Sequence, residues 1–174
     1  DGNLAGPKTL EHLVDCVCMI EGDRYKDLRL LRSIKNRFGS TNEVGIFQME
    51  GDGMREIKNP SEHILQDRNR AGIGSCLSVI VEGSRPIIIE VQALTSVTLF
   101  GYPKIAVSGY DANRLMIITA VLQKYADINL MNQDIYINVV GGMRVNDPAV
   151  DIAAALAIIS SFKKKPLPDN SVAL

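Results

Sequence analysis

The sequence predicts a mixed α/β (α+β) protein that is built from two parts. Between about residues 14 and 58, short runs of alternating apolar and polar residues are separated by tight turns, which is typical of an antiparallel β meander. Between about residues 72 and 174, apolar runs of strand length alternate with runs at helical spacing, which indicates an α/β unit. The polar stretch 68–72 separates the two patterns, so we predict one domain over 1–67 and a second over 68–174.

The composition is that of a globular protein. Of the 174 residues, 46% are hydrophobic and 22% are charged, which is enough apolar material for a core. The net charge of −1 argues neither for nor against a nucleic-acid partner, because it hides any local basic patch. The sequence contains no signal peptide and no apolar run of transmembrane length, so we expect no membrane partner.

The cysteines predict neither a disulfide framework nor a metal site. There are three of them, without paired spacing, and only two histidines accompany them. Cys16 and Cys18 alternate with apolar residues in a strand-like run, so we expect both thiols to be buried. Unpaired cysteines also favour a reducing, cytoplasmic compartment.

Four strands are expected in the first part. They are 15–20, 28–35, 43–50 and 54–57, and the last two are joined by a hairpin turn at Gly51-Asp52-Gly53. Segment 8–14 is expected to be a loop that leads into the first strand. A short helical stretch is expected at 63–67, after the break at Asn59-Pro60.

The second part is expected to contain four further strands and two helices. The strands are 74–82, 87–99, 105–108 and 133–140, and the apolar run of the second one predicts burial on both faces. Asp111 is a suitable N-cap for an amphipathic helix over 111–126. Asp147 followed by Pro148 begins a helix that extends to about Lys163, and its Ala/Ile-rich composition predicts burial.

The run Lys35-Asn36-Arg37-Phe38-Gly39 is the strongest candidate site. Because side chains alternate along a strand, Lys35 and Arg37 would project from one face, with Asn36 on the other. Two cations about 7 Å apart suit the phosphate groups of a nucleotide or of a nucleic-acid backbone. The spacing alone also allows a solvated edge strand whose charges discourage aggregation.

Several stretches of the sequence together resemble the bacterial RadA (Sms) family of DNA repair proteins. They are 1–15, 35–39, Asn59-Pro60-Ser61, Arg85-Pro86, 90–94, 111–115 and Gly141-Gly142, and the run 35–39 is the family's own signature. The resemblance extends over essentially the whole chain. It implies the end of a RecA-like ATPase core over 1–67 and most of a Lon-protease-like domain over 68–174. It also implies a longer parent that contains the P-loop, the Walker B acid and the zinc-binding cysteines.

The resemblance implies a DNA-dependent ATPase or helicase that acts in DNA repair and homologous recombination by branch migration. The implied assembly is a hexameric ring with ATP and Mg between its subunits, and zinc would be bound only by a missing N-terminal module. Single-stranded or branched DNA and a recombinase are the implied partners. This fragment alone is expected to bind none of these cofactors and not to hydrolyse ATP.

The resemblance also suggests roles for individual basic residues. Lys35 and Arg37 lie where basic residues of RecA-type assemblies reach a neighbour's nucleotide, which implies a trans-acting catalytic role. Direct DNA contact by the same pair is the alternative. Lys8 would lie at the tail of the DNA-binding loop of the core. Arg114 and Arg144 are candidate DNA-binding residues of the Lon-like part, and a structural salt bridge is the alternative for either.

Lon-type proteases carry their nucleophilic serine at the position after Pro148. Here that residue is Ala149, whose methyl group cannot attack a carbonyl. Ser160 and Ser161 lie about three turns further along the predicted helix and are poor substitutes. Serine peptidase activity is therefore not expected, and a purely structural oligomerisation scaffold is the main alternative function.

Overall fold

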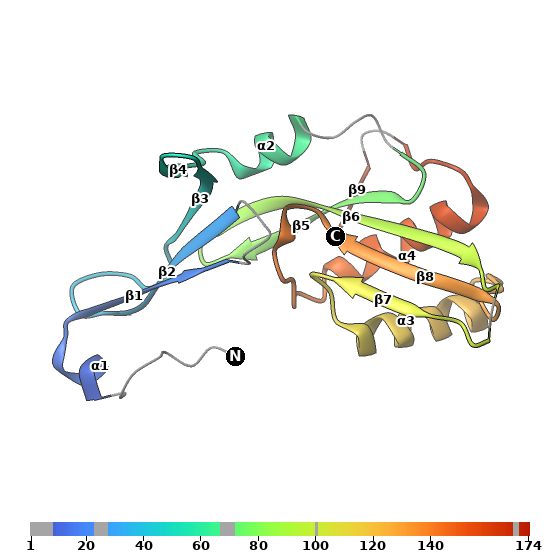
Figure 1. Ribbon diagram of the computed structural model, residues 1–174, viewed down its shortest axis with the longest axis horizontal. Helices are drawn as coiled ribbons and strands as arrows, with labels where there is room; N and C mark the ends of the chain where they lie inside the picture. Colours follow the sequence, from blue (N-terminus) through green and yellow to red (C-terminus); the bar gives the residue numbers. More distant parts are fainter. Residues whose placement is uncertain (1–8, 23–27, 67–71, 100, 169–170) are drawn as a thin grey trace. The chain divides into compact units, whose positions relative to one another are not determined.

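The computed structural model describes residues 9–22, 28–66, 72–99, 101–168 and 171–174 (Figure 1). They belong to two compact units. The first unit comprises Asp1–Lys58 with Val81–Arg85, and the second comprises Asn59–Ile80 with Pro86–Leu174. The domain boundary predicted between residues 67 and 68 lies outside the described residues.

The first unit contains an antiparallel sheet with the strand order β1-β2-β3-β4. Its strands are β1 (Cys16–Glu21), β2 (Leu28–Asn36), β3 (Val44–Glu50) and β4 (Gly53–Glu56), each close to a predicted strand. Val44 and Ile46 on β3 are buried. Arg32 on β2 forms ion pairs with Glu21, at 3.0 Å, and with Glu82, at 2.6 Å. The predicted antiparallel meander is confirmed.

A short helix precedes the sheet where we predicted a loop. It is α1 (Thr9–Leu13), and its five residues are too few to show a helical period in the sequence. Two main-chain carbonyls at its end, those of Glu11 and Val14, accept hydrogen bonds from the ammonium group of Lys35. The helix is thus stabilised by a residue that is far away in the sequence.

Cys16 and Cys18 are exposed, and the prediction that they are buried was wrong. The strand itself is β1, at the edge of the sheet. Alternation places the two cysteines and Ile20 on one face, where 55% of Ile20 is exposed. An apolar run predicts a strand, but it does not tell which face is covered. The two sulfur atoms lie 3.7 Å apart, next to a β-bulge between Val17 and Cys18.

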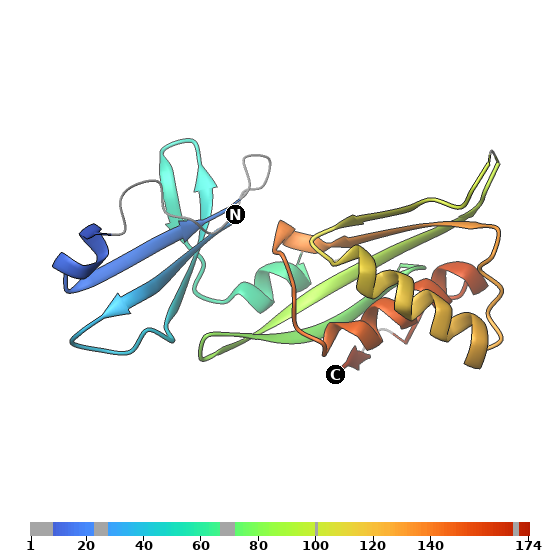
Figure 2. The same ribbon diagram turned by 90° about the horizontal axis from the view of Figure 1, so that it is seen from below.

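The second unit contains a mixed sheet, and its two long helices, α3 (Ala112–Tyr125) and α4 (Val150–Lys163), lie on one face of that sheet (Figure 2). The strand order is β7-β8-β6-β5-β9. Strand β6 pairs antiparallel with β8, whereas β7 runs parallel to β8 and β9 runs parallel to β5. The elements are α2 (Pro60–Gln66), β5 (Ser75–Glu82), β6 (Arg85–Val97), β7 (Ile105–Ser108), α3 (Ala112–Tyr125), β8 (Gln133–Val139), the 3-10 turn Val140–Gly142, α4 (Val150–Lys163) and β9 (Val172–Ala173). Together with the antiparallel sheet of the first unit, this sheet confirms the predicted mixed α/β class.

The core of the second unit lies between the sheet and the helices α3 and α4. Ile87, Ile89 and Val91 of β6 are fully buried, and so are Ala153, Ala154 and Ala157 of α4. Alanine side chains let this helix approach the sheet closely. The predicted burial of α4 is confirmed for the face that carries these residues, whereas Ile152 on the same helix is 51% exposed.

The prediction that strand β6 is buried on both faces was wrong. Leu94 is 59% exposed, and Gln92 beside it on the same face is exposed too. On β8, Tyr136 and Asn138 stand opposite these two residues in the register. The face of the sheet that carries these side chains is therefore open over the middle of β6 and β8.

Helix α3 begins directly after its predicted cap, Asp111, whereas α4 begins three residues after Asp147 instead of at Pro148. The carboxylate of Asp111 accepts a hydrogen bond of 2.9 Å from the main-chain N–H of Arg114, as expected of an N-cap. The carboxylate of Asp147 accepts one of 3.0 Å from the N–H of Ala149, although the regular helix starts only at Val150. Pro148 and Ala149 form a turn before it.

Gly74 occupies a position at the start of β5 that only glycine fits. Its φ is +82°, and a Cβ there would lie 2.2 Å from the carbonyl oxygen of Ala93. Its N–H donates to the hydroxyl of Ser160 at 2.9 Å, and its carbonyl accepts from Ala93 at 2.7 Å. The glycine thus joins β5, β6 and the end of α4.

Asp134 holds the connection between β6 and β7. One of its oxygens accepts hydrogen bonds from the N–H of Lys104 and the hydroxyl of Thr98, both at 2.9 Å. The N–H of Lys104, followed by the hydroxyl of Thr98, lowers the pKa of Asp134.

Candidate functional site

Lys35 is the last but one residue of β2, and its charge is directed at the chain itself. It stands opposite Val17 of β1. Its ammonium group donates to the carbonyls of Glu11, at 2.6 Å, and Val14, at 2.7 Å. A lysine at the C-terminal end of a helix satisfies carbonyls that lack a partner and complements the helix dipole. In this chain, Lys35 therefore fixes the segment that joins α1 to β1.

Arg37 reaches the same segment from just beyond β2. Its main-chain N–H donates to the carbonyl of Asp15 at 3.0 Å, and its guanidinium pairs with the carboxylate of Asp15 at 3.1 Å. The two side chains are 59% and 55% exposed. Exposed ion pairs of this kind contribute at most about 1 kcal/mol. The guanidinium is thus available to exchange its partner.

The residues between and after these cations form a turn organised by Asn36. Its side-chain oxygen accepts from the N–H of Phe38 at 3.1 Å, and its amide nitrogen donates to the carbonyl of Ser40 at 3.5 Å. A Cβ at Gly39 would lie 3.0 Å from that nitrogen. Phe38 is 85% exposed. The motif 35–39 thus combines one fixed cation, one exchangeable cation and one exposed aromatic ring.

Arg114 joins α3 to the start of α4. Its guanidinium donates to the carbonyls of Asn146 and Asp147, at 2.8 and 3.2 Å, and to the carboxylate of Asp151 at 2.6 Å. Tyr110 donates to the same carboxylate, and its ring lies 5.6 Å from the guanidinium carbon. The hydrogen bond to Asp151 raises the pKa of Arg114, while burial and then the same carboxylate raise that of Tyr110. Arg114 is thus a salt-bridge partner.

Arg144 is placed very differently from Arg114. It is exposed in the loop between β8 and α4, and the neighbouring residues Met143 and Val145 are buried and anchor that loop. No hydrogen bond or ion pair joins Arg144 to any residue that the structure describes. Its charge is therefore presented to solvent.

Ala149, which stands where the predicted Lon-like arrangement would have its serine, directly precedes α4. Ser160 and Ser161 are buried at the other end of the helix. The hydroxyl of Ser160 donates to the carbonyl of Lys165 at 2.6 Å, and that of Ser161 accepts from the N–H of Thr95 at 2.9 Å. Both hydroxyls are thus used to join the helix to its surroundings.

The remaining predictions concern Lys8, a metal site and the membrane. Lys8, the candidate DNA-binding residue near the N-terminus, lies outside the described residues. Within the part of the chain that the structure describes, no cluster of three or more His, Cys, Asp or Glu side chains is arranged to hold a metal ion. None of the described helices has the length and apolar character needed to cross a membrane.

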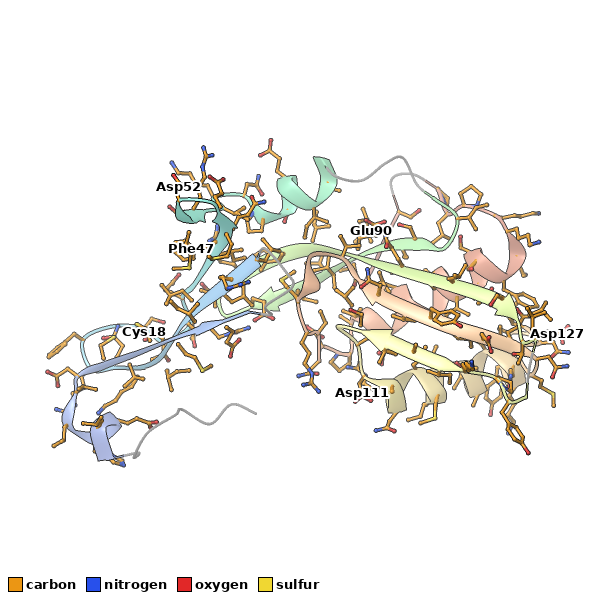
Figure 3. All side chains as sticks on the ribbon, in the orientation of Figure 1. Cys18, Phe47, Asp52, Glu90, Asp111 and Asp127 are labelled. Atoms are coloured by element: carbon orange, nitrogen blue, oxygen red, sulfur yellow. The ribbon has the colours of Figure 1, made fainter. Side chains whose placement is uncertain are left out.

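Sequence reasoning did not identify Glu90 as a feature of interest. It is a carboxylate on β6 and only 6% exposed (labelled in Figure 3), with Ser75 and Gln92 as hydrogen-bond partners. The sequence feature that could have identified it is an acidic residue in the middle of an apolar strand. Glu90 belongs to the second unit and is separate from the motif 35–39.

Comparison with known proteins finds relatives that are named DNA repair protein RadA. No protein-family model matches the chain. Over 166 residues it is 50% identical to the DNA repair protein RadA of Streptococcus pneumoniae and 47% identical to that of Bacillus subtilis, each match covering 95% of this chain. It is 49% identical over 164 residues, 94% of the chain, to the RadA of Halalkalibacterium halodurans. The chain spans only 40%, 36% and 36% of these relatives. The resemblance found in the sequence is confirmed, and the chain belongs to the bacterial RadA family of DNA repair proteins.

Proposed function

We propose that this chain is the part of a DNA repair protein that contributes the motif 35–39 to a DNA-dependent ATPase. The observation that carries the proposal is the identity of about one half, maintained over 95% of the chain, to proteins named for DNA repair. In this proposal, ATP and Mg are bound by a neighbouring subunit of a hexameric ring. The work done is branch migration on single-stranded or branched DNA during homologous recombination, together with a recombinase.

The geometry of the motif supports a division of roles between its two cations. Arg37 pairs with an exposed carboxylate at Asp15, and a nucleotide phosphate carries more charge and accepts two parallel hydrogen bonds from a guanidinium. If Arg37 exchanges the carboxylate of Asp15 for a phosphate as its partner, the cost in free energy is therefore small. Lys35 has two of its donors on main-chain carbonyls and keeps the segment 11–15 in place. Arg37 is thus the residue that reaches the phosphate, and Lys35 positions the segment with which Arg37 pairs.

The second unit is proposed to act as the assembly platform, with a DNA-contacting surface that includes Arg144. The exposed position of Arg144 supports this role. Arg114 has its donors on groups of its own chain, so in the proposal it shapes the platform from within. The three free thiols support a reducing, cytoplasmic compartment.

The test uses a full-length RadA in which this chain replaces the matching region. Arg37→Ala is compared with Arg55→Ala, because Arg55 is also an exposed arginine of the first unit and pairs with Glu50 at 3.4 Å. We expect Arg37→Ala to lower DNA-stimulated ATP turnover at least about tenfold, which corresponds to about 1.4 kcal/mol of transition-state stabilisation. Arg55→Ala should keep the parental rate.

Lys35→Ala is measured in the same protein, with sedimentation to verify that the ring still forms. We expect it to impair both ATP turnover and branch migration. If both activities stay normal with Lys35→Ala and with Arg37→Ala, the motif has no role in coupling. Loss of activity together with loss of the ring would instead assign the motif to assembly.

A structural scaffold is the second candidate function. It is favoured by the internal contacts of Lys35 and Arg114, which are those of structural residues. A scaffold requires that the chain associates with itself. Sedimentation of the isolated chain at micromolar concentration tests this, and a clean monomer there contradicts autonomous assembly.

A further inference from the structure

The open face of the second unit's sheet contains a cavity of about 520 Å³. Alternation along β6 places Glu90, Gln92 and Leu94 on the same face. In the register with β8, Asn138 stands opposite Gln92, and Tyr136 stands opposite Leu94. These five side chains and Ser75 of β5 line the cavity, which thus combines polar groups with one aromatic ring.

Glu90 is the unusual member of this lining. Its side chain is buried, and its Oε1 accepts hydrogen bonds from the hydroxyl of Ser75 and from the amide of Gln92, the latter at 3.4 Å. Both donors are neutral. Among the residues that the structure describes, no cation pairs with this carboxylate and no hydrogen bond reaches its Oε2. A buried carboxylate without a counter-charge is costly, so the cavity favours a ligand that supplies positive charge.

The remaining groups of the cavity also favour a ligand rich in donors. The amide nitrogen of Gln92 is used by Glu90, which leaves its amide oxygen as an acceptor. Tyr136 is part of the lining and offers a flat ring on which a planar cation stacks. A guanidinium is planar, always charged, donates two parallel hydrogen bonds to one carboxylate and gives up water more readily than an ammonium.

We propose that this cavity binds the guanidinium group of an arginine side chain supplied by a partner molecule. The two sources to be distinguished are a second copy of this chain, whose exposed Arg144 lacks a partner among the described residues, and a different protein. The proposal does not depend on the motif 35–39, which is in the other unit.

The direct test titrates the chain with N-acetylarginine methylamide and follows the NMR signals of the Gln92 and Asn138 amides. We expect saturable shifts with a dissociation constant of about 10 mM or tighter. The citrulline analogue has nearly the same shape without the charge and should not bind. Glu90→Gln keeps the size of the side chain and a partner for Ser75, and it should weaken binding at least about tenfold.

Two further variants complete the test. Glu56→Gln removes an exposed carboxylate of β4 and should leave binding unchanged. Tyr136→Leu keeps the carboxylate and removes the ring, so it should weaken binding severalfold. The proposal is overturned if the arginine analogue does not bind the parent chain. It is also overturned if the arginine analogue binds Glu90→Gln as tightly as the parent chain, or if the citrulline analogue binds the parent chain as tightly as the arginine analogue does. It is also overturned if binding appears only after Arg68 and Arg70 of the chain itself have been replaced by alanine.

Sedimentation identifies the source of the guanidinium. If a second copy supplies it, the chain associates with itself, and Glu90→Gln and Arg144→Ala each weaken the association without adding to one another. If the chain stays monomeric while the arginine analogue binds, the arginine belongs to a different protein.

Discussion

Replacing Arg114 by alanine tests whether this arginine stabilises the fold or contacts DNA. The substitution removes three hydrogen bonds that join α3 to Asn146, Asp147 and Asp151. A hydrogen bond to a charged group contributes about 1.5–3 kcal/mol, but the three share one guanidinium and the pair with Asp151 is partly exposed. We therefore expect a loss of about 2 kcal/mol in the free energy of unfolding.

Urea unfolding followed by circular dichroism at the helix band measures this loss, because the two long helices lie in the second unit. With a slope of about 2 kcal/mol per molar urea, the midpoint falls by about 1 M. Arg144→Ala is the matched control, since Arg144 is exposed, and it should change the free energy by no more than about 0.5 kcal/mol. Arg114→Lys keeps the charge but loses the planar fork, so it should lie between the two.

A double-mutant cycle with Asp151→Ala isolates the ion pair, and we expect a coupling of about 1 kcal/mol. Our reasoning is refuted if Arg114→Ala unfolds at the same urea concentration as Arg144→Ala. If Arg114→Ala instead weakens DNA binding in a chain of unchanged stability, Arg114 belongs to a DNA-contacting surface.

The remaining predictions concern Gly74, Asp134 and the cysteines. Gly74→Ala should destabilise the chain by at least about 2 kcal/mol in urea unfolding, because it adds a Cβ at a positive φ against a main-chain oxygen; an unchanged midpoint would contradict this. Asp134 has a lowered pKa, so its contribution to stability is present above its unfolded pKa of about 3.9 and is lost as the pH falls through the folded value. Asp134→Asn should therefore reduce the acid sensitivity of unfolding, as read from midpoints at a series of pH values. In the native chain, a thiol reagent should label Cys16 and Cys18 but not Cys76, which is 1% exposed, and equal labelling of all three in intact-mass spectra would refute the buried position of Cys76. The thiol of Cys16 raises the pKa of Cys18, so Cys16→Ser should speed the labelling of Cys18 near pH 8.

The elements that were predictable are those specified by neighbouring residues. Asp111 marks the start of α3 because a cap acts on amides only two or three residues ahead, and Asp147 likewise fixes the turn that precedes α4. The turn at Gly51-Asp52-Gly53 marks the hairpin between β3 and β4 for a similar local reason. In each case, the signal and the structure that it causes lie within one turn of chain.

The features that were missed depend on residues far apart in the sequence. The exposure of Cys16 and of Leu94 depends on which face of a sheet is covered, and alternation alone does not contain that information. The end of α1 is held by Lys35, more than twenty residues later. For the candidate site, the sequence predicted the motif 35–39 as a unit. It did not predict that Lys35 binds its own main chain while Arg37 pairs with Asp15.

The hydroxyls that join the second unit also affect how fast it folds. Ser160 bonds to Gly74, 86 residues away, Ser161 bonds to Thr95, 66 residues away, and Ser78 bonds to Ala173, 95 residues away. Each of these contacts forms only after a long loop has been closed, so the loss of chain entropy comes before the contact stabilises the fold. The strands of the first unit instead pair with their neighbours in sequence. We expect the meander to fold first, and the closing of α4 onto the sheet to limit the rate at which the whole chain becomes native.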